Sequence, residues 1–333
     1  MKFLVVGLGS MGKRRIRNLI TLGYDAKKIA GFDIRSERCE EAESLYAIAS
    51  FGNFTDAIES FSPQAIIIST DPSCHMDYAE PAFDLGLHCF IEASVTELER
   101  IKGLCNKLKD SSLVIAPSNT MRYYPGPSLI RKIIEKELIG KPLILNYHTG
   151  QYLPDWHPWE NIEDFYVSRR ETGGAREIVP FELAWINEIF GNPAPICGVK
   201  DKLAAFQADI DDIYCCLLRY PNGMIANVTI DVISRPKATR SLMILGSEGK
   251  IIFDGDKNSV RYINTSMSDW AETFFDSGTV EEGYINPEEP YIAEVRDFIA
   301  AIEKVDRKIF PNSLEKDIEV LALLNRLEMM SVP

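Results

Sequence analysis

The segment GLGSMG, residues 7–12, has glycines at the spacing G-x-G-x-x-G, which suits the binding of a dinucleotide pyrophosphate. Gly7 permits a tight turn, Gly9 lets the backbone approach the phosphates, and Gly12 lets a following helix pack close to the preceding strand. The first N–H groups of that helix would point at the phosphates. We therefore expect the whole turn to contact a dinucleotide, through Gly7, Gly9, Ser10, Met11 and Gly12.

Asp33 ends a second predicted strand, in the segment KIAGFDIR, and lies where this fingerprint requires an acidic residue. Its carboxylate could accept hydrogen bonds from the hydroxyls of the adenosine ribose. That favours NAD over NADP, because a carboxylate repels a 2′-phosphate. Arg35 leaves NADP open, since its guanidinium could meet such a phosphate or stack on the adenine.

Short apolar strands alternate with helices through the first 120 residues, which predicts a doubly wound parallel sheet of the Rossmann type in an α/β chain. In such sheets a ligand lies beyond the carboxyl ends of the strands. The topology brings five polar residues from successive strand ends to one crevice, where we expect them to contact the cofactor: Thr70, Asp71, His75, Glu92 and Asn119.

The order and spacing of several short segments together match one known group of enzymes. These segments are GLGSMG (7–12), STDPSCH (69–75), DLGLHCFIEAS (84–94), NTMRYYP (119–125), TGGA (172–175), GSEGKIIFD (246–254) and EVRDFIAAI (294–302). They resemble the glucose–fructose oxidoreductase and inositol dehydrogenase superfamily, the Gfo/Idh/MocA group. The resemblance implies a Rossmann domain at 1–120 and an α+β domain at 121–333 with a large open, mostly antiparallel sheet. It also implies a nicotinamide cofactor and a C-terminal helix that returns to the first domain.

The chain departs from this group at the residues that usually handle the proton. The group places lysine and proline after the strand-end glutamate, whereas Glu92 is followed by Ala93 and Ser94. It also places a histidine on a helix that faces the nicotinamide, and that position becomes Phe181 when the segments are aligned on the trailing Phe-Gly. A slip of one residue would place Glu182 there instead.

Oxidation of an alcohol by NAD releases a proton, so another group must accept it if the chain is an enzyme. General acid–base groups contribute about 10²- to 10⁴-fold in rate. His157 is the first choice, because imidazole titrates near neutrality. Tyr152 and Tyr166 are alternatives if a nearby arginine lowers the phenol pKa. The carboxylates Glu177 and Glu182 are further candidates, although each of these side chains could also be structural.

The same region, residues 146–182, is rich in groups that could bind a substrate. Guanidinium forks fit carboxylates and phosphates, so an anionic sugar derivative is one candidate ligand. Trp156 could form an apolar wall against a sugar face. The candidate substrate-binding residues are Arg122, Trp156, Tyr166, Arg169 and Arg170. No cluster of residues has the spacing of a metal site.

Composition excludes several functional classes. The formal net charge of -13 argues against sequence-independent binding of nucleic acid and against docking on an anionic membrane. No apolar run approaches the roughly 18 residues of a membrane span. Seven cysteines without a CxxC pair do not form a disulfide framework, so we expect a reduced, cytoplasmic protein. An open antiparallel sheet predicts a homodimer or homotetramer through the C-terminal domain.

Three functional hypotheses remain at this stage. The first is an NAD(P)-dependent oxidoreductase that acts on a sugar or sugar derivative, such as a nucleotide sugar or a nonulosonate precursor, with a non-standard acid/base residue. The second is a non-catalytic cofactor-binding regulator. The third is a lyase or epimerase in which bound NAD is reduced and then reoxidised. The many ionisable groups of residues 146–182 favour an occupied pocket and hence the first hypothesis.

Overall fold

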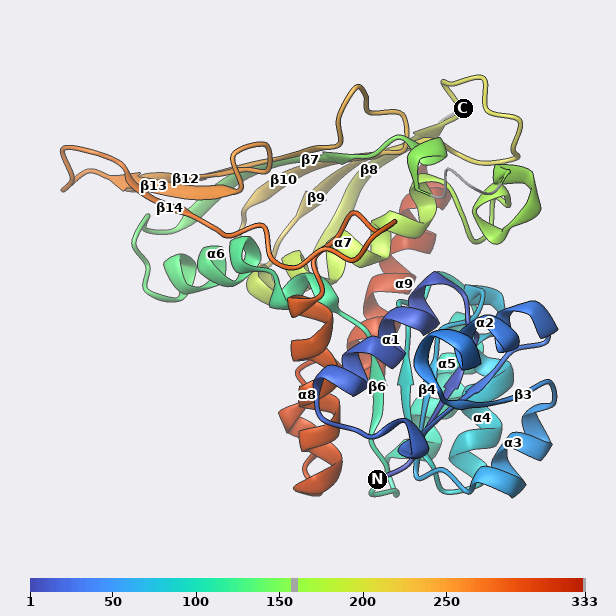
Figure 1. The fold of residues 1–333 in the computed structure, drawn as a ribbon. Coiled ribbons are helices and arrows are strands. Elements are labelled where there is room, and N and C mark those ends of the chain that lie inside the picture. Colours follow the sequence, from blue (N-terminus) through green and yellow to red (C-terminus); the bar gives the residue numbers. More distant parts are fainter. Residues whose placement is uncertain (157–160, 332–333) are drawn as a thin grey trace. The chain divides into compact units, whose positions relative to one another are not determined.

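The computed structural model describes residues 1–156 and 161–331, and divides the chain into two compact units (Figure 1). The first unit contains residues 1–120 and 278–318. The second contains residues 121–277 and 319–333. Each unit has its own sheet and its own hydrophobic core.

The sheet of the first unit is parallel, with the strand order β3-β2-β1-β4-β5-β6 in the described residues. Its strands are β1 (Phe3–Val6), β2 (Ile29–Phe32), β3 (Ala49–Phe51), β4 (Ala65–Ile68), β5 (His88–Ile91) and β6 (Ile115–Pro117). The order reverses between β1 and β4, and Val6 lies level with both Phe32 and Ile68. The strands therefore end together at one edge, and the predicted doubly wound Rossmann sheet is confirmed.

Helices connect these strands and complete the core. They are α1 (Ser10–Thr21), α2 (Ser36–Tyr46), α3 (Phe54–Phe61), α4 (His75–Asp84) and α5 (Leu98–Leu108). The later helix α8 (Glu289–Glu303) also belongs to this unit, and its Val295 and Phe298 are fully buried in the same core as Phe3 and Phe90. Apolar residues at helical spacing along α8 thus cover part of the first unit, although they lie far away in the sequence.

The sheet of the second unit has the order β14-β13-β12-β11-β7-β10-β9-β8 in the described residues. Its strands are β7 (Pro142–Gly150), β8 (Ala194–Asp201), β9 (Ile213–Arg219), β10 (Ile225–Asp231), β11 (Thr239–Gly246), β12 (Gly249–Asp254), β13 (Ser259–Asn264) and β14 (Ala271–Phe274). Only the described pair β7–β10 is parallel, so the predicted large, mostly antiparallel sheet is confirmed.

Helices α6 (Pro125–Glu135) and α7 (Ala175–Phe190) lie on one face of this second sheet (Figure 1). The last helix, α9 (Leu314–Met330), begins in the first unit, and its residues from 319 onward belong to the second. Side chains alternate along the strands, so that Leu145 and Tyr147 are buried while Ile144 is exposed. One face of the sheet therefore builds the core of the unit, and the opposite face is left open.

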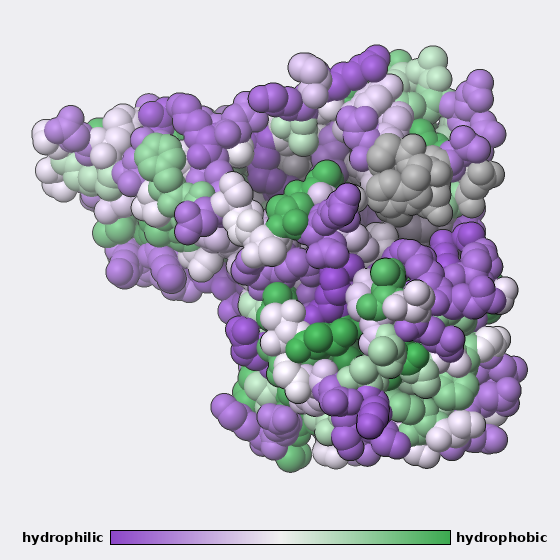
Figure 2. Space-filling model, in the orientation of Figure 1, coloured by the Kyte–Doolittle hydropathy of each residue, from purple (hydrophilic) through white to green (hydrophobic). Residues whose placement is uncertain are grey.

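The surface agrees with the composition. Hydrophilic side chains dominate the face drawn in Figure 2, and apolar side chains form small separate groups there. Within the described residues, no helix is both long and apolar enough to cross a membrane. The described residues also contain no group of three or more histidine, cysteine, aspartate and glutamate side chains that could hold a metal ion.

Candidate active site

The glycine turn between β1 and α1 has the geometry that a dinucleotide requires. A Cβ on Gly7 would lie 2.7 Å from the carbonyl oxygen of Ser69, and one on Gly12 would lie 1.8 Å from the carbonyl oxygen of Gly7. Gly7 also has a positive φ of 88°. Side chains are thus sterically excluded from both positions.

Gly9 is different, because a Cβ there would meet only the guanidinium of Arg38, at 3.4 Å. Gly9 caps α1 without any side-chain hydrogen bond, so the first N–H groups of this helix can bind an anion. The turn therefore leaves an open cradle at a helix N-terminus, which fits the phosphates of a dinucleotide.

Asp33 is almost fully buried at the end of β2. Its Oδ2 accepts a hydrogen bond from the Leu8 N–H at 2.8 Å, and its Oδ1 accepts one from the Arg35 N–H at 2.9 Å. The guanidinium of Arg38 lies 3.7 Å from Oδ2, whereas the Arg35 side chain pairs with exposed Glu37. Sequence reasoning singled out Arg35, but Arg38 on α2 is the arginine that lies beside both Asp33 and the glycine turn.

The next three predicted residues follow β4, with Thr70 and Asp71 in the loop and His75 at the start of α4. Asp71 accepts hydrogen bonds from the N–H and the hydroxyl of Ser73, which fixes the loop. His75 is buried, and its Nε2 lies 3.2 Å from the carbonyl oxygen of Thr70. Burial lowers the pKa of His75 to about 4, so the imidazole is neutral at physiological pH. Its Nδ1 is buried and has no hydrogen-bond partner among the described residues.

Glu92, at the end of β5, is held by a buried arginine. Arg15 on α1 forms a fork with its carboxylate, at 2.6 Å and 2.9 Å, and also bonds to Glu294 on α8 at 3.2 Å. Glu294 is fully buried and accepts hydrogen bonds from the Asn119 N–H at 2.6 Å and the Thr120 hydroxyl at 2.7 Å. This network ties the phosphate-binding helix to the ends of β5 and β6, and it leaves Glu92 ion-paired.

Sequence reasoning missed a second carboxyl group near the end of β5. Ser94 is buried, and its side chain lies close to Asp317 in the first turns of α9. Burial raises the pKa of Asp317 to about 6, although the nearby Ser94 hydroxyl opposes the shift. Oδ2 of Asp317 and Oδ1 of Asn119 are both buried without a partner among the described residues. Sequence separation hid this arrangement, since no local pattern links residues 94 and 317.

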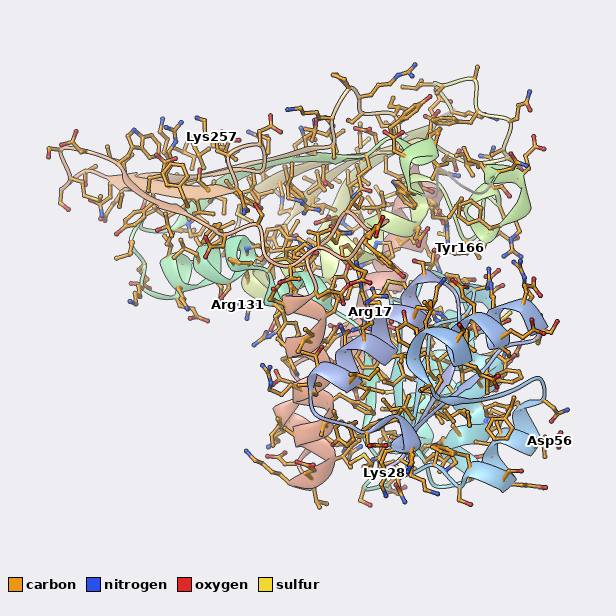
Figure 3. All side chains as sticks on the ribbon, in the orientation of Figure 1. Arg17, Lys28, Asp56, Arg131, Tyr166 and Lys257 are labelled. Atoms are coloured by element: carbon orange, nitrogen blue, oxygen red, sulfur yellow. The ribbon has the colours of Figure 1, made fainter. Side chains whose placement is uncertain are left out.

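In the second unit, two of the predicted residues form a pair. Tyr166, labelled in Figure 3, lies in a short helical turn before α7. Its hydroxyl donates a hydrogen bond of 2.6 Å to Oε1 of Glu177 in the first turn of α7. Oε2 of Glu177 is buried and has no partner among the described residues. Burial raises the pKa of Glu177 to about 7, against the opposing effect of the bond from Tyr166. The pair therefore combines a phenol with a carboxyl group that exchanges protons near neutrality.

Glu182, the other candidate carboxylate, has a different environment. It is 1% exposed and accepts hydrogen bonds from the Tyr147 hydroxyl at 2.7 Å and from the indole of Trp185 at 2.8 Å. It also forms an ion pair with Arg240 at 2.8 Å. The geometry assigns Glu182 to a buried structural ion pair, because burial and these partners leave its carboxylate closed to solvent.

The candidate arginines are already paired with carboxylates or the backbone. Arg122 forms an ion pair with Glu188, which it shares with Arg131. Arg170 pairs with Asp209 and Asp211, and the backbone of Arg169 forms a β-bridge with Asp209. These carboxylates neutralise the charges of Arg122 and Arg170. Neither arginine therefore offers an unpaired positive charge to an anionic substrate.

The remaining aromatic candidates pack within the second unit. The ring of Tyr152 contacts Phe206 and lies 4.5 Å from the guanidinium of Arg235. Trp156 packs against the core, and its indole nitrogen is buried without a partner among the described residues. His157, the first choice for acid/base chemistry, lies outside the described residues.

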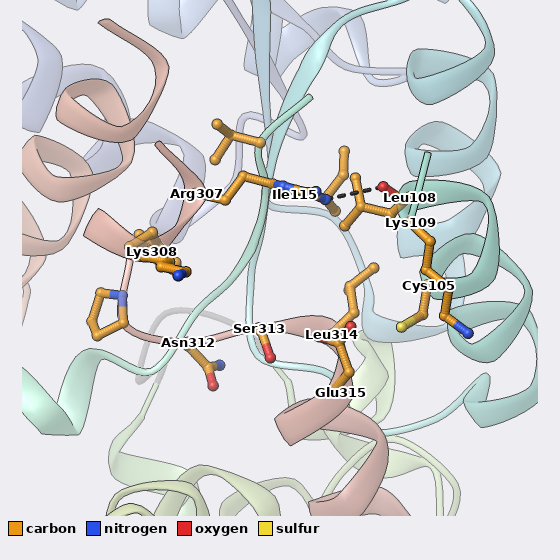
Figure 4. A pocket seen from close by; sticks show the side chains of 13 residues that line it. Cys105, Leu108, Lys109, Ile115, Arg307, Lys308, Asn312, Ser313, Leu314 and Glu315 are labelled. Carbon is orange, nitrogen blue, oxygen red and sulfur yellow. Dashed lines mark hydrogen bonds between the residues drawn. The ribbon is translucent and has the colours of Figure 1, made fainter. Parts of the chain in front are cut away.

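A separate hollow of about 530 Å³ lies in the first unit, beside the edge strand β6 (Figure 4). It is bounded by the start of β6 at Ile115, the end of α5 at Leu108 and the segment 307–315. Arg307 donates a hydrogen bond to the carbonyl oxygen of Leu108 across it. None of the residues predicted for the candidate site lines this hollow.

Two family models match the chain in sequence order. The model of the oxidoreductase family with an NAD-binding Rossmann fold matches residues 1–118, and that of the Gfo/Idh/MocA C-terminal domain matches residues 128–252. The chain belongs to the Gfo/Idh/MocA oxidoreductase family. Its first unit is an NAD-binding Rossmann domain.

Two curated relatives of this family member match most of its length. UDP-N-acetylglucosamine 3-dehydrogenase of Acidithiobacillus ferrooxidans is 28% identical over 346 aligned positions, covering 98% of this chain and 99% of the relative. Inositol 2-dehydrogenase of Burkholderia cenocepacia is 21% identical over 289 positions, covering 83% and 82%. Among solved structures, levoglucosan dehydrogenase in complex with NADH and levoglucosan has a TM-score of 0.84 at 17% identity, covering 99% of this chain and 97% of that one.

The structure of this Gfo/Idh/MocA member shows what occupies the altered positions. Phe181 packs against the hydrophobic core of the second unit, together with Ala184. Ala93 is half-buried beside buried Ser94. Neither position offers a proton acceptor, so the acid/base group must come from elsewhere in the chain.

Proposed function

We propose that this protein oxidises a secondary hydroxyl of a sugar or sugar derivative with NAD, and that Glu177 and Tyr166 form its acid/base pair. The observation that carries the assignment concerns the two carboxyl oxygens of Glu177. Oε2 is buried and has no partner among the described residues, while the Tyr166 hydroxyl holds Oε1. A general base works best when its pKa is close to the working pH. The pKa of Glu177, raised by burial to about 7, meets that condition.

Gly7, Gly9 and the first N–H groups of α1 would hold the pyrophosphate, and Asp33 the adenosine ribose. Bound NAD supplies the hydride acceptor. Oε2 of Glu177 accepts the proton of the substrate hydroxyl, while the Tyr166 O–H keeps the other carboxyl oxygen oriented. The hydroxyl carbon loses its C–H hydrogen as a hydride and its O–H hydrogen as a proton, so the alcohol becomes a carbonyl.

The substrate class follows from the family and from the named relatives. UDP-N-acetylglucosamine, inositol and levoglucosan, named with those proteins, all carry ring hydroxyls on secondary carbons. We propose a substrate of the same chemical kind, which includes nucleotide sugars. The ion pairs of Arg122 and Arg170 give no support for a substrate selected mainly by its negative charge.

The test is a panel of inositol, levoglucosan and UDP-N-acetylglucosamine with NAD, followed by the absorbance of NADH. With any compound that is oxidised, Glu177→Gln should lower kcat by about 10²- to 10⁴-fold and leave the affinity for NADH unchanged. Glu171→Gln is the matched control, because this nearby carboxylate is exposed. An active Glu177→Gln enzyme would exclude the pair as the acid/base group, and a wild type that binds neither NADH nor NADPH would exclude the oxidoreductase itself.

We also propose that the protein is a homodimer or homotetramer that assembles through the open face of the second sheet. Register places Ile144 level with Leu245 on one side and Ile225 on the other, and these side chains lie on that face. Ile144 and Leu245 are exposed, at 40% and 38% of their surface. An apolar row of this kind on an uncovered sheet is typical of a subunit interface.

A further inference from the structure

The strand order places the two halves of the dinucleotide over different strands of the first unit. The order reverses between β1 and β4, and Asp33, after β2, lies on the adenosine side of the reversal. In a doubly wound sheet of this kind the nicotinamide half then lies over the ends of β4, β5 and β6. Polar groups at those three strand ends are therefore the ones available to the nicotinamide ring.

Each of these three strand ends has a buried polar atom without a partner among the described residues. The atoms are Nδ1 of His75 after β4, Oδ2 of Asp317 beside Ser94 after β5, and Oδ1 of Asn119 after β6. Buried polar atoms in folded proteins are nearly always hydrogen-bonded, because an unmet donor or acceptor costs free energy. Three such atoms at neighbouring strand ends indicate a ligand with polar groups.

All three atoms require a hydrogen-bond donor. The carbonyl oxygen of Thr70 can only accept, so Nε2 of His75 carries the proton and Nδ1 is an acceptor. The amide oxygen of Asn119 is an acceptor, as is the carboxylate oxygen of Asp317. The carboxamide of a nicotinamide ring brings two N–H donors, which can meet two of these three acceptors.

Asp317 lies beside the altered motif after β5. Its neighbour Ser94 directly follows Ala93. The resemblance implies a lysine at position 93, whereas alanine offers no cation there. The Ser94 side chain places the carboxyl group of Asp317 next to the turn after β5. Oδ2 of Asp317 has no partner among the described residues and can accept a hydrogen bond from a ligand at that turn.

We propose that Asp317 is a cofactor-binding residue whose Oδ2 accepts a hydrogen bond from the carboxamide N–H of the nicotinamide ring. The proposal rests on the proposed function, because it requires that the protein binds a nicotinamide dinucleotide. The residue that recognises the nicotinamide carboxamide would then lie on α9, more than two hundred positions after the turn that follows β5.

The test compares NADH with the reduced form of 3-acetylpyridine adenine dinucleotide, in which a methyl group replaces the carboxamide nitrogen. Fluorescence titration of the full-length protein gives both dissociation constants. Wild type should bind NADH about tenfold or more tightly, as expected for a hydrogen bond to a charged group. Asp317→Ala should lose most of this preference, whereas Glu319→Ala, which removes an exposed carboxylate from the same helix, should keep the wild-type preference.

Equal loss of affinity for both dinucleotides in Asp317→Ala would overturn the proposal, since it would indicate a merely structural role. A wild type without preference would overturn it as well, and the proposed function would still stand. If NADH does not bind to wild type at all, the proposed function fails first. Asp317→Asn decides the question if the alanine variant does not fold, because it keeps the shape of the side chain and an acceptor oxygen. This variant should retain part of the preference for NADH. Full retention of that preference would contradict a role for the charge of Asp317.

Discussion

Glu177 is expected to set the pH dependence of the reaction. As a base it must be deprotonated, and burial raises its pKa to about 7. Alcohol oxidation should therefore increase with pH through a midpoint near 7, and carbonyl reduction should decrease through the same midpoint. The measurement is kcat against pH in both directions. A profile without a titration near 7 in the oxidation direction would exclude Glu177 as the base.

The same shift predicts how Glu177 changes stability. The folded protein binds this proton more tightly than the unfolded chain does, because the pKa rises from 4.5 to about 7 on folding. The contribution of Glu177 is therefore fully present below the unfolded pKa and is lost as the pH rises through the folded pKa. Glu177→Gln should gain stability relative to wild type between about pH 5 and about pH 8. Urea unfolding at both pH values measures this, and Glu171→Gln should show no such trend.

At the scale of elements, the close contact of β1 with α1 depends on Gly12. A Cβ there would overlap the backbone carbonyl of Gly7, which cannot move aside as a flexible side chain would. Gly12→Ala should therefore abolish tight NADH binding and lower the melting temperature. Gly103→Ala is the control, because a Cβ at this exposed position in α5 would contact nothing within 4 Å. It should stabilise the protein by roughly 0.5 to 1 kcal/mol, and NADH should bind as to wild type.

Helix α8 is joined to the strand ends through Glu294. This carboxylate is fully buried, bonds to Arg15 and accepts hydrogen bonds from Ser118 and Thr120. Glu294→Ala leaves these donors unpaired in the interior and should lower the free energy of unfolding by about 3 to 5 kcal/mol. The exposed pair of Glu99 with Lys102 provides the comparison, since Glu99→Ala should cost less than about 1 kcal/mol. Similar costs for the two variants in denaturant unfolding would contradict this account of the network.

At the scale of the whole molecule, the open face of the second sheet is expected to be covered by another copy. Ile144→Asp places a charge at the centre of the apolar row that Leu245 and Ile225 continue. Light scattering after size exclusion should show a dimer or tetramer for wild type and a monomer for the variant. A monomeric wild type at micromolar concentration would rule out this interface, whereas a variant with unchanged mass would place the interface elsewhere.

Local features of the fold follow from the sequence alone. The roles of Gly7 and Gly12 follow from their spacing, because the turn, the strand before it and the helix after it are adjacent in the chain. The doubly wound sheet follows from the alternation of apolar strands and helices. That Glu177 and Tyr166 take part in the reaction stays a prediction. Their hydrogen bond to each other could not be predicted from the sequence and is seen only in the structure.

Other features required the tertiary structure. Glu182 was an equally good candidate base in the sequence, yet the fold buries it against Tyr147 and Arg240. The sequence by itself determined the phosphate turn and the parallel sheet, because both arise from neighbouring residues and regular periodicity. Only the tertiary structure decided which carboxyl groups are ion-paired and which, like Asp317, keep an unmet oxygen. The reason is physical: burial and partners fix the pKa and hydrogen bonds of a side chain, and they come from residues far away in the sequence.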